Sequence, residues 1–214
     1  DSIVIKAILT RAYALNPDII KGLKFRSLAD NYTGQAERRG ESFEIRIGSE
    51  FKVVTKGNTL SVAEVFAHEL AHIGRLKFIK NNSKEYRDLQ ALFASKDGRS
   101  VLKKAITALH GGVYTAQAQK EFKRATDPNK PESFEEFIAG FASLYLLADI
   151  QPTIENLSNS ESNLWQKLQS VVKRIISGLS NTFKSLQIAF DTGDAKTNKE
   201  LRRMALNVFG YDTT

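Results

Sequence analysis

Apolar and polar residues follow two different periods along the chain. In most of the sequence apolar residues recur roughly every three or four positions, which predicts helices, at residues 2–15, 61–80, 84–93, 100–109, 133–147, 164–186 and 196–208. Residues 43–47 instead alternate apolar with polar, which predicts a strand, and residues 51–54 are a second candidate strand. Residues 23–32 fit a helix or an irregular packing segment, and residues 31–41 are polar and turn-rich. We therefore expect an α+β fold that is predominantly α-helical, with a small β element before the second helix.

A polar break at residues 148–163 divides the chain into two parts. We expect a domain at residues 1–150 and a C-terminal helical segment at residues 151–214, which packs on this domain or on a partner. The helix expected at residues 164–186 has a basic face opposite its apolar face, together with Trp165. Such a helix can also lie on an anionic membrane surface, but packing is the stronger of the two expectations.

The second helix carries a His-Glu-x-x-His pattern, formed by His68, Glu69 and His72. Residues four apart on a helix lie one turn above each other, so both imidazoles leave the same face and can bind one metal ion. Glu69 projects beside that position, where a carboxylate can take a proton from a bound water. The two histidines could instead be ordinary packing residues, but this helix is largely apolar, and buried histidines need partners. Ser61 and Glu64 have the spacing of a capping box and predict the start of the helix.

A catalytic zinc site needs three protein ligands, so the chain must supply one more. The sequence has no cysteine, and the third ligand must therefore be a histidine or a carboxylate. Glu136 lies near the start of the helix expected at residues 133–147, on one face with small residues that would let this helix approach the second helix closely. We expect Glu136 to be the third ligand, and Glu135 is the alternative; whichever does not bind metal could hold the other ring nitrogen of a ligand histidine. The plain structural alternative is a capping box between Ser133 and Glu136.

His110 and Tyr114 lie in a glycine-containing loop after the helix expected at residues 100–109. A neutral His or Tyr donor can stabilise the oxyanion that forms when an activated water attacks a carbonyl group, and either residue could do so here. The plain alternatives are a histidine that faces the dipole at a helix C-terminus and an ordinary loop aromatic.

Charge and composition add further expectations. The 214 residues carry a formal net charge of +7, but the basic residues are dispersed, so we expect solvated surface rather than nucleic-acid binding. No apolar run reaches the roughly 18 residues of a transmembrane helix. The N-terminus lacks Met and a charged-then-apolar leader, which suggests a processed product or a piece of a longer polypeptide. We expect a location in the cytoplasm, or in a virion or a host cell after delivery.

The stretch His68–Gly74, followed far downstream by Glu135–Ala142, resembles the gluzincin class of zinc metallopeptidases. The Glu-Phe-x-Ala form at Glu136 resembles the third-ligand helix of lethal-factor-like toxins and of metallopeptidase-like domains in phage and mobile-element proteins. By position, the resemblance implies a zincin-like core in which His68, His72 and Glu136 bind Zn²⁺ and Glu69 is the general base. The sequence departs from the thermolysin pattern, because the spacing from His72 to Glu136 is long and no Asp follows at the usual offset.

This resemblance implies a zinc-dependent endopeptidase that hydrolyses a protein or peptide substrate. The alternative is a non-catalytic zinc-binding module of a larger phage or toxin-like protein, within a virion or toxin assembly. The intact Glu69 favours catalysis, because a purely structural zinc site has no need of a base.

Overall fold

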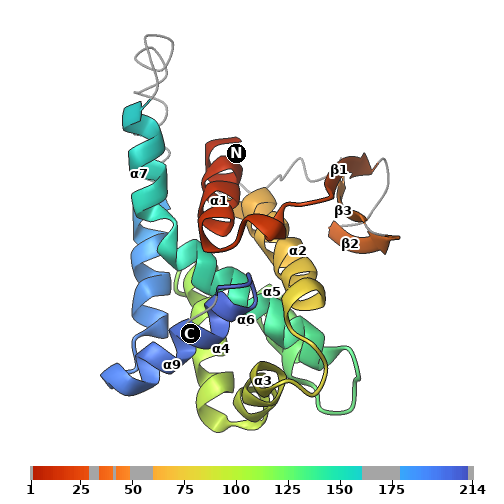
Figure 1. The fold of residues 1–214 in the computed structure, drawn as a ribbon. Coiled ribbons are helices and arrows are strands. Elements are labelled where there is room, and N and C mark those ends of the chain that lie inside the picture. Colours follow the sequence, from red (N-terminus) through yellow and green to blue (C-terminus); the bar gives the residue numbers. More distant parts are fainter. Residues whose placement is uncertain (1, 29–33, 41, 49–59, 161–178, 212–214) are drawn as a thin grey trace.

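The structure is a computed structural model that describes residues 2–28, 34–40, 42–48, 60–160 and 179–211. This part of the chain is predominantly helical, with one small sheet (Figure 1). The helices are α1 (Ser2–Leu15), the 3-10 helix η1 (Pro17–Ile19), α2 (Leu60–Phe78), α3 (Lys84–Ala94), α4 (Lys96–Leu109), α5 (Ala116–Thr126), α6 (Ser133–Asp149), α7 (Gln151–Ser160) and α9 (Ala195–Asn207), with a further helical stretch at residues 179–190. The strands are β1 (Leu23–Leu28), β2 (Gly34–Arg39) and β3 (Ser42–Gly48).

Helix α2 connects the sheet to the helical part of the molecule. It packs against α6 along one side and against β2 and β3 along another, and in Figure 1 the sheet lies beside α2, far from α7. Phe66, Leu70 and Ile73 anchor the helix in the core, each fully or almost fully buried. Gly74 lies where the chain after α9 crosses α2, so close that a Cβ atom there would overlap the carbonyl oxygen of Val208. This packing fixes α2 on three sides.

The sheet has the order β1-β3-β2, with β1 parallel and β2 antiparallel to β3. Phe25 and Ala36 both pair with Ile45, so these three residues share the face that lies toward α2. On β2 this face carries Gly34, Ala36 and, at its exposed end, Arg38. A Cβ atom at Gly34 would overlap the side chain of Val65 on α2. The small residues therefore allow β2 to lie directly against α2.

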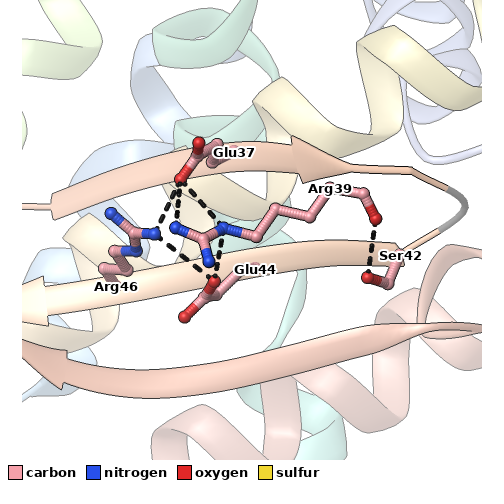
Figure 2. A network of polar contacts seen from close by, with 5 residues as sticks. All are labelled: Glu37, Arg39, Ser42, Glu44 and Arg46. Atoms are coloured by element: carbon pink, nitrogen blue, oxygen red, sulfur yellow. Dashed lines mark hydrogen bonds and ion pairs between the residues drawn. The ribbon is translucent and has the colours of Figure 1, made fainter.

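The opposite face of β2 and β3 carries a network of charged side chains (Figure 2). Arg39 Nε lies 3.1 Å from Glu44 Oε2, and Arg46 Nη2 lies 2.7 Å from Glu37 Oε2. Glu44 is only 4% exposed, so its charge depends on these guanidinium groups. The network joins β2 and β3 across this face.

The structure corrects two expectations about the N-terminal part of the chain. Residues 23–28 form strand β1, not a helix or an irregular segment, and the region expected to be polar and turn-rich contains strand β2. The strand was not recognised because β2 has no large apolar residue on either face: Gly34, Ala36 and Arg38 lie on one face, and Gln35, Glu37 and Arg39 lie on the other. The strand expected at residues 43–47 is confirmed as β3, and the one expected at residues 51–54 lies outside the described residues.

The helices expected in the rest of the chain agree with the structure within a few residues, with two exceptions. Helix α5 was not expected; it begins after Thr115, whose Oγ1 accepts a hydrogen bond from the amide of Ala118. The polar break after residue 148 contains α7 instead of a connector. Most of the helix expected at residues 164–186 lies outside the described residues. The side chain of Ser61 is also not described, so the capping box expected between Ser61 and Glu64 stays a prediction.

The described C-terminal helices lie on the core. Helix α9 contacts α3 and α6, and Phe183, Phe190 and Phe209 are buried. Within the described ranges, no helix is by itself long and apolar enough to cross a membrane; α6 and α7 meet that test only together, across a 47° bend.

Candidate metal centre

Helix α2 presents two histidines side by side. The ring centroids of His68 and His72 are 4.8 Å apart, and the ring planes meet at 81°. Both side chains are about one-quarter exposed, whereas the apolar face of the same helix is buried. The i, i+4 spacing expected from the sequence therefore places both rings on one accessible face of a firmly packed helix.

Helix α6 brings a carboxylate to these histidines. Glu136 Oε2 lies 3.3 Å from His68 Nε2, and Glu136 Oε1 lies 3.9 Å from His72 Nε2. One donor atom from each of the three residues lies within 4.8 Å of the other two. Two ligands of a tetrahedral zinc ion, each about 2.0–2.2 Å from the metal, are about 3.3–3.6 Å apart. The three side chains could therefore hold a metal ion, and their spacing is close to that of zinc ligands.

The surroundings favour the protonation states that bind metal. Burial, and next the charge of His68, lower the pKa of His72 to about 4, and the opposing effect of Glu136 is smaller. Burial alone would raise the pKa of Glu136, but its contacts with His68, Arg124 and His72 outweigh this effect and lower the pKa to about 2. At neutral pH, His72 is therefore a neutral imidazole and Glu136 a carboxylate, which are the forms that coordinate a metal ion.

Glu69 lies beside the three residues and contacts β2. Its side chain is largely buried, and its carboxylate accepts a hydrogen bond from the backbone amide of Ala36. Burial raises the pKa of Glu69, although the charges of His68 and Arg124 and the hydrogen bond from Ala36 oppose the shift. A carboxylate whose pKa is raised toward neutrality is a better proton acceptor than an exposed one.

The alternative ligand, Glu135, points elsewhere. Glu135 Oε1 accepts a hydrogen bond of 3.0 Å from Arg75 Nη2, and Arg75 also donates to the carbonyl oxygen of Ile79. The alternative role for Glu136, a capping box with Ser133, is absent from the described contacts: α6 has no side-chain cap, and Ser133 Oγ donates to the carbonyl oxygen of Arg124. Of the two glutamates, Glu136 is the one that reaches the histidines.

His110 and Tyr114 lie in the connection between α4 and α5. Their described contacts do not include His68, His72 or Glu136. His110 follows the last residue of α4 as its C-cap, and its Nε2 lies 3.0 Å from Glu121 Oε2. Tyr114 packs edge-on against Phe122, and Lys103 lies over its ring. Their proposed role as oxyanion donors stays a prediction without a contact to support it.

Sequence reasoning missed Arg124 on α5. Arg124 Nη2 donates a hydrogen bond of 2.5 Å to Glu136 Oε1. No sequence pattern pointed to it, because its place at the site depends on how α5 packs on α6. Only the Thr115 cap could have indicated that a helix begins there.

The chain matches no family model, no curated protein and no solved structure. Support for a function therefore comes from the residues of the site alone.

Proposed function

We propose that the protein is a zinc-dependent peptidase with a zincin-like core, in which His68, His72 and Glu136 hold the metal. The observation that carries this proposal is the cluster of these three side chains with Glu69 beside it. Two imidazoles and one carboxylate leave a fourth position of a tetrahedral zinc ion open, as catalytic zinc sites require. Bound zinc would supply Lewis acidity, which polarises a carbonyl group and makes a water molecule more acidic.

The chain's own residues would then move the proton. The carboxylate of Glu69 accepts a proton from the attacking water and returns it to the nitrogen of the leaving amine. The hydrogen bond from the Ala36 amide holds this carboxylate in place, and the raised pKa of Glu69 suits both steps. A site that only stabilised the fold would not need a carboxylate in this position.

Strand β2 supports a peptide as the substrate. Among the described residues β2 pairs with β3 alone, and the Ala36 amide of β2 donates a hydrogen bond to the Glu69 carboxylate. A peptide in extended conformation can add to such a strand through backbone hydrogen bonds. This arrangement would place a peptide bond beside Glu69, independently of the side chains of the substrate.

The first experiment measures zinc content and peptide hydrolysis on the same preparations. We expect about one zinc per wild-type chain and cleavage of members of a mixed peptide library, detected by mass spectrometry. Glu69→Gln should keep its zinc and lose cleavage, because the substitution removes the proton acceptor and leaves the three ligands.

Two results would count against the proposal. A folded wild-type protein that takes up no zinc, even from solution, would exclude the metal site. Equal cleavage by wild type and Glu69→Gln would exclude the role of Glu69. Bound zinc without cleavage of any peptide would instead favour a non-catalytic zinc module of a larger phage or toxin-like protein.

A further inference from the structure

Arg124 is tied to α6 at two points. Its carbonyl oxygen accepts a hydrogen bond of 2.6 Å from Ser133 Oγ, and its guanidinium donates one of 2.5 Å to Glu136 Oε1. Ser133 and Glu136 lie one turn apart on α6, so the backbone and the side chain of Arg124 are both held against the same helix face. The guanidinium is therefore positioned at the candidate metal site even though its helix is not part of the His-Glu-x-x-His pattern.

Most of this guanidinium remains available. The Arg124 side chain is 66% exposed, and Glu136 is its one side-chain partner among the described residues. A guanidinium has five N–H donors, so several remain for a further acceptor. Glu136 Oε1, the acceptor of this hydrogen bond, lies 3.9 Å from His72 Nε2. The exposed donors of Arg124 therefore lie beside the candidate ligands.

Resting on the proposed function, we propose that Arg124 is the oxyanion-binding residue of this site. When the oxygen of water forms a bond to the carbonyl carbon, the π electrons of the C=O bond move to the carbonyl oxygen. The proton of the water goes to Glu69, and the negative oxygen accepts a hydrogen bond from the guanidinium of Arg124. A charged donor fixed before the reaction stabilises this developing charge without reorganisation. The sequence had suggested His110 or Tyr114 as the oxyanion donor, but their side chains contact Glu121 and Phe122 on α5.

The test uses binding of simple probes to the cobalt-substituted protein, whose visible spectrum reports a ligand at the metal. Methylphosphonate is a tetrahedral anion that resembles the oxyanion, and imidazole is a neutral control. We expect Arg124→Gln to weaken methylphosphonate binding at least about tenfold at saturating cobalt and to leave imidazole binding unchanged. Arg124→Lys should restore part of the difference, because it keeps the charge without the planar fork.

A matched variant controls for the loss of charge. Lys123→Gln removes one exposed positive charge from the adjacent residue of α5, which has no described contact with the site, and should bind both probes as the wild type does. Folding of Arg124→Gln is expected, because the side chain is mostly exposed and the hydrogen bond from Ser133 goes to the backbone.

The outcomes separate this inference from the proposed function. Equal methylphosphonate affinity in wild type and Arg124→Gln, or an equal loss for imidazole, would overturn the oxyanion role while the metal site stands. A variant that binds cobalt more weakly but binds methylphosphonate normally once loaded would also overturn it, because Arg124 would then only orient Glu136. Failure of the wild type to bind cobalt would remove the proposed function and this inference together.

Discussion

Glu136 Oε2 on α6 lies 3.3 Å from His68 Nε2 on α2, whereas the adjacent Glu135 is bonded to Arg75. This difference predicts opposite results for two neighbouring substitutions. Glu136→Gln should weaken zinc binding by more than about 100-fold, because even a residue that only supports a ligand contributes about 10- to 100-fold. Glu135→Gln should leave zinc affinity within about threefold of wild type, since it removes none of the three ligands.

Competition for zinc against a chelating dye measures both affinities. Unfolding curves run alongside would show whether loss of the Arg75–Glu135 pair lowers stability without affecting zinc. Similar zinc affinities for the two variants, or a larger loss for Glu135→Gln, would show that Glu136 is not the third ligand.

The sequence predicted His68, Glu69, His72 and Glu136 as candidates because each depends on spacing within one helix. The i, i+4 rule places both histidines on one face. The close approach of α6 to α2 was also expected, although Gly140, one of the small residues after Glu136, lies nearest to Leu102 on α4. Arg124 could not be found in this way, because its contact with Glu136 depends on the turn between α5 and α6. Spacing within one helix was thus enough to identify these four residues, but a residue that reaches the site through the packing of two helices could not be identified from the sequence.

Strand β2 shows the same limit for the fold. Its inner face is small because α2 lies directly against it, so the apolar alternation that identifies most strands is replaced by Gly34 and Ala36. The contact that places β2 beside Glu69 thus also removed the signal by which the strand could have been predicted.

Gly34 gives a second prediction, about the contact between β2 and α2. A Cβ atom at this position would overlap Val65 and lie 3.0 Å from Glu69 Oε1. We expect Gly34→Ala to lower the free energy of unfolding by about 1–3 kcal/mol through overpacking and to reduce peptide cleavage, because β2 and Glu69 must move apart. Zinc content should not change, since the atoms nearest to a Cβ at Gly34 belong to Val65 and Glu69 and not to the three proposed ligands.

Gln35→Ala is the matched control, because Gln35 is exposed and faces away from α2. It should keep both stability and cleavage. Unchanged cleavage in Gly34→Ala would show that the β2–Glu69 contact is not needed for activity.

Two glycines within helices predict opposite effects on stability. A Cβ atom at Gly74 would overlap the carbonyl oxygen of Val208, whereas one at Gly140 would meet only Leu102 Cδ1, at 3.6 Å. Gly74→Ala should destabilise the protein by at least about 1–3 kcal/mol, because a backbone segment has to shift. Gly140→Ala should raise stability by about 0.5–1 kcal/mol, because alanine is the better helix former. Chemical denaturation of the two variants measures both changes, and a stability gain in Gly74→Ala would contradict the close crossing of α2 by the C-terminal chain.

Glu64, one turn before His68, predicts how stability depends on pH. Burial, and next the charge of Glu121, raise the pKa of Glu64 to about 8, compared with an ordinary value of 4.5. Between these two values the unfolded chain has released this proton and the folded protein still binds it, so Glu64 lowers stability increasingly as pH rises. Below pH 4.5 both states are protonated, and the penalty is absent.

Glu64→Gln should therefore have the stability of wild type near pH 4 and exceed it by about 2–4 kcal/mol at pH 8, allowing for partial exposure of the side chain. Glu121→Gln should reduce the pH dependence without removing it, because burial is the larger cause and remains in this variant. Free energies of unfolding from urea titrations between pH 4 and 8 measure the difference. A Glu64→Gln variant whose advantage is constant over this range would show that the pKa of Glu64 is the same in the folded and the unfolded protein, which would contradict the raised pKa.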